Sequence, residues 1–384
     1  MKVDAWHLPW GTDTVPHALL DVIRGCNISC NACYNTRPAS IKPVAEVAAE
    51  LKTLLSLRRL ESAALIGGEV LLHPQFADLV RLIKAEGLCA QVCTNGVLLD
   101  DRRLEELKAA GLDLIFAHID RGQTRPDLPP PGSREQVREL WERKAALIAK
   151  HGIDVGLAMT AFEDKLPDVR DMVSFVIESP HVNYLLVTLF RDMERFAGIR
   201  GDLLSGMRGT LRDPAAKRTD TLTNVTIDRY MRAELNLRPF CYLGSNLDAG
   251  DPRWLSYLVA TRRDRAGGVA RHSLKVSGFE KAFLAASLRC TGKYPMYRRQ
   301  RAFPLIVQLL MNALTGGDFV GNTRFLAGCL RPGSRLGAKR LLFQYPADVE
   351  PDGSVSHCIS CPDAIIKDGK LVPVCICDHV SVVA

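Results

Sequence analysis

Between residues 18 and 190, short apolar runs alternate regularly with amphipathic helical stretches, and this alternation constrains the fold most. The apolar runs are Ala18–Ile23, Ala63–Ile66, Ala90–Thr94, Leu114–Ile119, Val155–Thr160 and Tyr184–Leu189. The helical stretches are Val44–Leu60, Gln75–Glu86, Asp101–Ala110, Ser133–Lys150 and Leu166–Glu178. Repeated strand–helix–strand units form right-handed crossovers and a parallel sheet. The sequence therefore predicts an α/β fold, an open doubly wound sheet or a partial barrel, with ligands at the carboxyl ends of the strands.

The alternation stops after residue 190, and the rest of the chain has a different character. We expect residues 191–328 to form an insertion and a basic, mostly helical region, with a loop to about Thr219 and a helix at Asp228–Leu235. Between Arg253 and Arg301, twelve Lys or Arg residues stand against two acids, a local balance of +10. Such a block either binds an anion or is a solvated basic face. Residues 329–384 are predicted to form a Cys-rich C-terminal metal domain. The sequence therefore predicts three units, residues 18–190, 191–328 and 329–384.

Composition and the N-terminal sequence exclude several classes of protein. A chain with 47% hydrophobic and 24% charged residues is not disordered, collagen-like or a polytopic membrane protein. No signal-peptide pattern opens the chain, and the apolar stretch Phe303–Leu314 is shorter than the roughly 20 residues that span a bilayer. We therefore expect a cytoplasmic protein without a transmembrane segment. In that reducing compartment, twelve cysteines indicate metal binding or redox chemistry.

Three of these cysteines follow the first predicted strand with the spacing C-x3-C-x2-C. They are Cys26, Cys30 and Cys33. Three thiolates on one short loop can bind three irons of a cuboidal [4Fe–4S] cluster and leave the fourth iron open to a small molecule. A zinc site would need a fourth protein ligand nearby, and Tyr34 does not supply one. The spacing therefore predicts an iron–sulfur site.

The cysteine motif resembles the CxxxCxxC signature of the radical S-adenosylmethionine (SAM) superfamily, with its usual aromatic residue displaced to Tyr34. Four more segments at strand ends match in the family's order. Ile66–Val70, followed by His73–Pro74, resembles the GGEP segment, although Val70 replaces proline. Cys93–Gly96 is similar to the TNG turn, His118–Asp120 to a polar strand end, and Gly156–Thr160 to the stretch beside adenine. The resemblance covers about residues 18 to 190.

This resemblance implies a partial (β/α)6 TIM-like barrel in which SAM chelates the open iron. Reduction of the cluster would then yield a 5′-deoxyadenosyl radical that abstracts a hydrogen atom from an unactivated C–H bond. A flavodoxin or ferredoxin would supply the electron. The resemblance assigns His118 and Asp120 to the catalytic site. The cofactor-binding residues that it implies are Gly67, Gly68, Glu69, Thr94, Asn95, Asp120 and Thr160.

A second metal site is predicted near the C-terminus, where Cys358 and Cys361 form a CxxC pair. Cys375 and Cys377 follow, and in an extended strand residues two apart face the same side. Four thiolates suit an iron–sulfur cluster or structural zinc. The segment is similar to the SPASM or twitch auxiliary-cluster extensions, without the full seven-cysteine spacing. We therefore expect a second iron–sulfur cluster, with zinc as the alternative.

The remaining cysteines carry weaker predictions. Cys329 is a candidate extra ligand of the second metal site. Cys89 and Cys93 are expected to be core residues, because free cysteine packs as a small hydrophobe. Cys241 and Cys290 either approach the substrate or are simply buried.

The sequence leaves the substrate open. The basic block is interleaved with apolar residues, which favours a small-molecule or lipid-like substrate with an anionic group. The alternatives are a ribosomally made peptide and a cobalamin-independent methyl transfer, since no DxHxxG pattern is present. Only about seventeen residues precede the first strand, too few for a peptide-recognition segment. A scaffold that binds SAM without radical chemistry also remains, whereas no RNA-binding motif supports a nucleic-acid partner.

Overall fold

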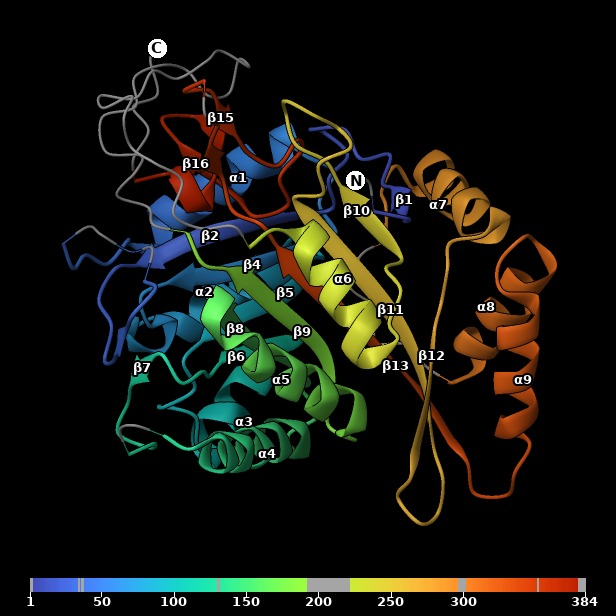
Figure 1. The fold of residues 1–384 in the computed structure, drawn as a ribbon. Coiled ribbons are helices and arrows are strands. Elements are labelled where there is room, and N and C mark those ends of the chain that lie inside the picture. The colour runs from blue at the N-terminus through green and yellow to red at the C-terminus, as the bar shows by residue number, and fades with distance from the viewer. Residues whose placement is uncertain are drawn as a thin grey trace.

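The computed structural model describes residues 3–33, 35, 38–129, 132–191, 222–295, 302–350 and 352–378 (Figure 1). Tyr34 and most of the predicted loop up to Thr219 lie outside these residues. Six parallel strands form the first part of the main sheet, with neighbours in chain order. They are β2 (His17–Ile23), β4 (Ser62–Gly67), β5 (Cys89–Thr94), β6 (Leu114–His118), β8 (Asp154–Ala161) and β9 (Val182–Leu189). The predicted α/β fold with its (β/α)6 partial barrel is confirmed.

Helices connect these strands as the alternation predicts. They are α1 (Val44–Leu57), α2 (Phe76–Ala85), α3 (Asp101–Ala109), α4 (Arg134–Lys150) and α5 (Leu166–Glu178), and α6 (Asn224–Leu235) follows the last strand. The side chains of Ser133 and Gln136 form a capping box at the start of α4. All seven residues of β2 are buried, as expected for a strand covered on both faces. The core between these elements is apolar, so the polar side chains at the ends of the strands mark the candidate functional site.

Within the described ranges the sheet continues to eleven strands. After β9 come β13 (Arg335–Gln344), which is parallel to it, and then β11 (Trp254–Arg263), antiparallel to β13. The sheet is completed by β10 (Cys241–Leu243), β1 (Trp6–His7) and β12 (Val269–Ser273). The region beyond the helix at Asp228–Leu235, predicted to be mostly helical, therefore also contains the strands β10–β12. Trp254 to Thr261 are all buried, so β11 lacks the alternation that identifies a half-buried strand.

Three helices follow β12: α8 (Ala302–Leu314) and α9 (Phe319–Cys329) lie beside β13 and β12, and α7 (Gly278–Thr291) packs on α8 near β1 (Figure 1). The inner sides of α8 and α9 pack against β11 and β13 through a separate apolar cluster that includes Leu258, Leu305 and Phe325. In the part of the chain that the structure describes, no helix is long and apolar enough to cross a membrane.

The C-terminal segment forms two small hairpins beside β2 and α1 (Figure 1). They are β14 (Asp348–Val349) with β15 (Val355–Ser356), and β16 (Ala364–Lys367) with β17 (Lys370–Pro373). The predicted strand through Cys375 and Cys377 is wrong, because Val374–Ile376 form a 3-10 turn that the Cys377 amide closes on the Val374 carbonyl. With three residues per turn, Cys375 and Cys377 point to different sides.

Candidate functional site

The loop that carries the cysteine triplet is fixed against the end of β4 by two backbone hydrogen bonds. The Gly68 amide donates to the Ile23 carbonyl at 2.6 Å, and the Glu69 amide donates to the Gly25 carbonyl at 2.8 Å. A Cβ atom on Gly67 would lie 2.0 Å from the Ile23 oxygen, and one on Gly68 would lie 2.1 Å from the Gly25 oxygen. The glycine pair therefore allows the two backbones to approach closely enough to hold the cysteine loop in place.

The three cysteines of this loop are free thiols with different exposures. Cys26 and Cys33 are exposed, whereas Cys30 is half-buried. Cys30 lies on a short strand, β3 (Ser29–Cys30), which pairs with β7 (Gln123–Thr124) beyond β6. Burial, the Asp120 carboxylate and the two neighbouring thiols raise the pKa of Cys30 to about 12. The triplet and Asp120 thus belong to one site.

The donor set of the triplet fits a polynuclear cluster. Within the described ranges, no three His, Cys, Asp or Glu side chains come close enough together to hold a single metal ion. A tetrahedral zinc site, with Zn–S bonds of about 2.3 Å, requires such convergence. Thiolates of a cuboidal cluster bind separate irons and lie farther apart. The triplet supplies three thiols on one loop at the carboxyl edge of the sheet, which is the donor set of such a cluster.

Glu69 connects the end of β4 to the end of β5. Its side chain is fully buried, and the two carboxylate oxygens accept hydrogen bonds from the Leu71 amide at 3.0 Å, the Thr94 hydroxyl at 2.6 Å and the Asn95 amide at 2.8 Å. Burial raises the pKa of Glu69, and these donors, with the charge of Arg125, act against that rise. The carboxylate is therefore occupied by donors of its own chain, and it positions Thr94 and Asn95.

Asn95 connects the end of β5 to the cysteine loop. Its side-chain amide donates to Asn27 Oδ1 at 2.7 Å and lies 3.8 Å from the Cys26 sulfur. The buried guanidinium of Arg125 donates to the Asn95 carbonyl at 2.8 Å and forms an ion pair with Asp127. Asn95 was expected here from its motif, whereas no role was predicted for Asn27, a variable position of the cysteine motif, or for Arg125.

Asp120 is held between the ends of β6 and β8. One oxygen lies 3.0 Å from His118 Nε2 and accepts from the Thr160 amide at 3.1 Å, and the other accepts from the Gly122 amide at 2.8 Å. Burial alone would raise the pKa of Asp120, but His118 and the two amides outweigh it, so the pKa lies below its usual range. The structure thus brings together His118, Asp120 and Thr160 around an ionised carboxylate.

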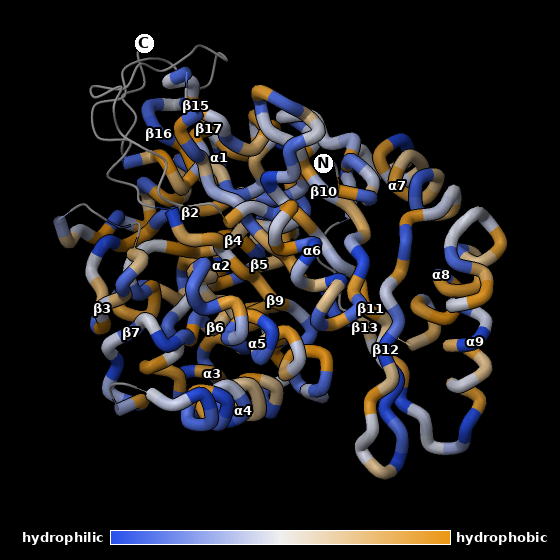
Figure 2. Tube along the Cα trace, viewed as in Figure 1, coloured by the Kyte–Doolittle hydropathy of each residue, from blue (hydrophilic) through white to orange (hydrophobic). Residues whose placement is uncertain are grey.

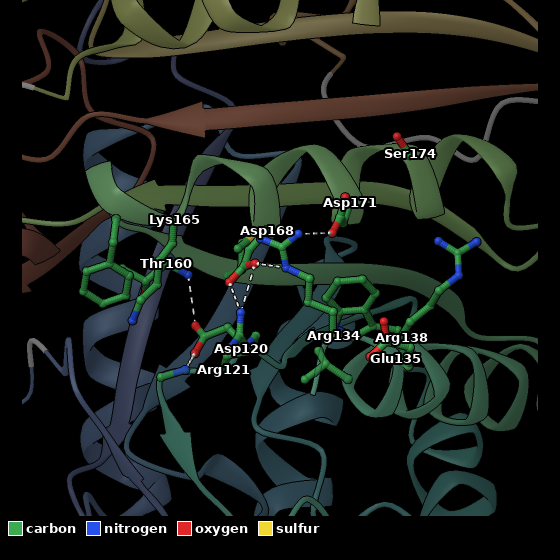
Figure 3. Close-up of a pocket in the computed structure, with 15 residues that line it drawn as sticks. Asp120, Arg121, Arg134, Glu135, Arg138, Thr160, Lys165, Asp168, Asp171 and Ser174 are labelled. Carbon is green, nitrogen blue, oxygen red and sulfur yellow. Dashed lines mark hydrogen bonds and ion pairs between the residues drawn. The ribbon is translucent and has the colours of Figure 1, made fainter. Parts of the chain in front are cut away.

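A cavity of about 300 Å³ opens beside Asp120, between the N-terminal halves of α4 and α5 (Figure 3). Asp120, Thr160 and Phe162 lie on its strand side. On its helix side, Asp168 accepts from Arg121 at 3.3 Å and from Arg134 at 2.9 Å. Opposite charges thus pair along the cavity wall. Of these residues, only Asp120 and Thr160 were predicted from the sequence.

The C-terminal cysteines are brought together only in part. The thiols of Cys358 and Cys361 share a hydrogen bond, and Cys361 lies close enough to Cys375 for their thiolate charges to interact. Burial and its thiol neighbours raise the pKa of Cys375 to about 12, and the Ala347 amide donates to its sulfur at 3.5 Å. Cys377 lies on the other side of the 3-10 turn and faces Arg24. The four thiols therefore form a chain of neighbours rather than one compact set.

Cys93 packs against apolar side chains, as expected of a core residue. It packs against the apolar cluster that contains Cys375 and Cys377, and also against the cluster that includes Cys358. Cys329, in contrast, lies on α9 with its sulfur 3.4 Å from the Phe325 carbonyl, within the separate cluster of α8 and α9. Cys241 is buried in β10 and Cys290 is exposed on α7.

Arg24 joins the two cysteine segments. It forms ion pairs with Asp21 and, at 3.0 Å, with Asp378, and its guanidinium lies 3.9 Å from the Cys377 sulfur. It also donates to Asn35 Oδ1 at 3.2 Å, just beyond the triplet. Burial lowers the pKa of Arg24, but the two carboxylates raise it further, so the charge is permanent. No motif pointed to Arg24 or Asp378.

Comparison with known proteins agrees with this geometry. Residues 20–176 match the model of the radical SAM superfamily. A PqqA peptide cyclase of Gluconobacter oxydans is 35% identical over 168 residues, which is 42% of this chain and 45% of that protein. A tungsten-containing aldehyde ferredoxin oxidoreductase cofactor-modifying protein of Pyrococcus furiosus is 23% identical over 168 residues, 41% of this chain and 47% of its own length. The solved structure of Streptococcus suis SuiB bound to S-adenosylmethionine has a TM-score of 0.38 at 15% identity, with 47% of this chain and 42% of that chain covered.

The segment of residues 20–176, which holds the cysteine loop and the parallel strands from β2 to β8, belongs to the radical SAM superfamily. Its cofactors are those of the superfamily, a [4Fe–4S] cluster and SAM. The chain spans less than half the length of each of these curated relatives.

Proposed function

We propose that the protein is a radical SAM enzyme and that Cys26, Cys30 and Cys33 hold its [4Fe–4S] cluster. The observation that carries the proposal is the attachment of the cysteine loop to Gly67–Gly68 at the edge where Asn95 and Asp120 also lie. When bound, the cluster and SAM supply the one-electron chemistry that removes a hydrogen atom from an unactivated C–H bond.

The chain's own residues prepare this edge for a polar ligand. Gly67 and Gly68 keep the strand end free of side chains, and Glu69 fixes Thr94 and Asn95. Asp120 stays ionised and is a ready acceptor for hydroxyl groups, with His118 beside it. We assign cofactor binding to Gly67, Gly68, Glu69, Thr94, Asn95, Asp120 and Thr160, with Glu69 acting through the residues that it positions.

We further propose that Cys358, Cys361, Cys375 and Cys377 belong to a second metal site. A second iron–sulfur cluster is favoured over zinc because four thiolates suit such a cluster and the segment is similar to auxiliary-cluster extensions. Zinc bound after anaerobic purification, with no iron at this site, would reverse that assignment.

Two substrate classes are supported by different observations. The basic and apolar helices at the end of the sheet favour a small-molecule or lipid-like substrate with an anionic group. The names of the relatives, a PqqA peptide cyclase and the subtilosin biosynthesis protein AlbA of Bacillus subtilis, favour a ribosomally made peptide. A cobalamin-independent methyl transfer is the third candidate. We place the reaction in the cytoplasm, with a flavodoxin or ferredoxin as reductant.

The proposal is tested by assaying 5′-deoxyadenosine after the reconstituted protein is mixed anaerobically with dithionite and SAM. Wild-type protein and Cys290→Ala, which changes an exposed cysteine away from the site, are expected to form it. Cys30→Ala is expected to form none. Equal amounts from Cys30→Ala, or none from wild-type protein that carries its full complement of iron, would refute the proposal.

A further inference from the structure

Helix α8 has two apolar faces, and only one of them is packed against the protein. Leu305, Leu309 and Ala313 are buried on the inner face. The outer face consists of Phe303, Val307, Leu310, Met311 and Leu314, with Phe303 76% and Leu314 72% exposed. Their spacing of three or four residues puts them on one side of the helix. Because the helix carries no charged residue, this face is a continuous apolar strip of about 17 Å.

The strip continues onto the start of α9. Phe319 is 58% and Val320 61% exposed, directly after the turn that joins the two helices. Figure 2 shows the apolar colouring along α8 at the outer edge of the molecule. Single exposed apolar residues are ordinary, but a contiguous patch indicates an interaction surface.

A buried polar network holds the helices in this pose. Asn312 and Asn322 are fully buried, and the side chain of Asn322 donates to that of Asn312 at 2.8 Å. Asn312 in turn donates to the Glu280 carboxylate on α7 at 2.9 Å, and Glu280 also caps its own helix through Ser277. The outer side chains are therefore presented by a rigid three-helix unit.

The exposed charged side chains of the three-helix unit that bears the strip are of one sign. Lys281, Arg289, Lys293, Arg324 and Arg331 are exposed on or beside α7 and α9. Across the described ranges, none of these five side chains forms an ion pair with a carboxylate. The two acids of the unit are engaged, since Glu280 binds Asn312 and Asp318 caps α9 by accepting from the Gly321 amide at 2.9 Å. A second copy docked through this face would bring like charges together, which costs free energy.

We propose that the α8–α9 outer face binds the surface of an anionic lipid bilayer. Phe303, Leu310, Leu314 and Phe319 enter the boundary between headgroups and acyl chains, and the surrounding cations contact lipid phosphates. Apolar strips flanked by Lys and Arg bind at this depth, and the electrostatic part of the attraction falls as salt screens it. This attachment does not depend on which reaction the cysteine triplet supports.

The test is flotation of the full, reconstituted protein with two kinds of vesicle, phosphatidylcholine alone and phosphatidylcholine with phosphatidylglycerol. We expect binding to the anionic vesicles, weaker binding at high salt, and little binding to the neutral ones. The double variant Leu310→Glu/Phe319→Glu should reduce the bound fraction at least tenfold. Leu247→Glu is the matched control, because Leu247 is 47% exposed and Leu310 is 48% exposed, and it should bind like wild type.

Three results would overturn the proposal. The first is failure of the wild-type protein to float with anionic vesicles. The second is equal binding by the double variant, whose circular dichroism should match that of wild type because both positions are exposed. The third is a wild-type dimer in light scattering without lipid that Leu310→Glu/Phe319→Glu converts to monomer, which would assign the face to self-association.

Discussion

The guanidinium of Arg24 lies 3.0 Å from the carboxylate of Asp378, so a residue two positions before the cysteine triplet is paired with the residue after the last C-terminal cysteine. Both side chains are buried, 8% and 3% exposed. The two cysteine segments, more than 300 residues apart in sequence, are therefore held by one ion pair. Removing the charge of Arg24 leaves the buried carboxylates of Asp21 and Asp378 without their shared cation, which is more costly than losing a surface pair.

Arg24→Gln is accordingly expected to lower the free energy of unfolding of the metal-free protein by about 3 kcal/mol, the usual cost of breaking a buried pair. Arg81→Gln, which breaks a pair with Asp78 at 2.7 Å on the exposed face of α2, should cost less than about 1 kcal/mol. Urea denaturation under reducing conditions measures both. If Arg24→Gln, Asp378→Asn and the double variant give strictly additive losses, the two side chains are not coupled.

Gly68→Ala is expected to prevent cluster assembly at the triplet. Its Cβ would lie 2.1 Å from the Gly25 carbonyl oxygen, so the cysteine loop must move away from β4. The matched control is Gly25→Ala on the opposite side of the same contact, where the nearest side-chain atom is Ala39 Cβ at 4.0 Å. Iron per chain after reconstitution should fall for Gly68→Ala and stay at the wild-type value for Gly25→Ala. A fully loaded Gly68→Ala protein would contradict the close approach.

Glu69→Gln should destabilise the fold even though it changes only one oxygen to an amide. All the oxygen contacts of Glu69 are with donors, so the new amide group faces an N–H or O–H that it cannot accept from. The cost of a buried unsatisfied donor is about 1–3 kcal/mol. Glu86→Gln, at an exposed position after α2, provides the baseline in the same denaturation experiment. A Glu69→Gln protein as stable as Glu86→Gln would mean that the carboxylate is not needed there.

His17 makes stability depend on pH. Burial, and then the charge of Arg58, lower the pKa of His17 to about 3, well below its usual 6.5. At pH values between about 3 and 6.5, His17 therefore binds a proton in the unfolded chain and not in the folded chain. The free energy of unfolding consequently falls as the pH drops below 6.5. The loss between pH 6.5 and 5 should be about 1.5 kcal/mol from this group alone.

His17→Gln keeps a partner for the Ser62 hydroxyl, 2.8 Å from the ring, and removes the titration. The variant should show a shallower fall in unfolding free energy over this pH range than wild type. Parallel curves for His17→Gln and wild type would show that His17 is not held neutral.

The sequence predicted the parallel half of the molecule well because each strand there is a short apolar run between helices with a clear period. The prediction of Leu166–Glu178 agrees with α5 at both ends. Prediction from the sequence failed for β11, because a continuous apolar run looks the same in a buried strand and in a buried helix. It also failed for Cys375 and Cys377, where a 3-10 turn follows Pro373.

The candidate site was likewise predictable from the sequence only in part. Residues in motifs at strand ends, such as Asn95 and Asp120, could be named because parallel strands bring their carboxyl ends to one edge. Arg24 with Asp378, and Arg125 with the Asn95 carbonyl, could not, because these contacts arise from tertiary packing between segments with no shared pattern.

The most direct test of two iron–sulfur sites is the iron and sulfide content after anaerobic reconstitution. Wild-type protein is compared with the triple variant Cys26→Ala/Cys30→Ala/Cys33→Ala. We predict about eight irons per wild-type chain and about four per variant chain, each with matching sulfide. A variant that retains all of the wild-type iron would show that the triplet is not the cluster site and would contradict the account.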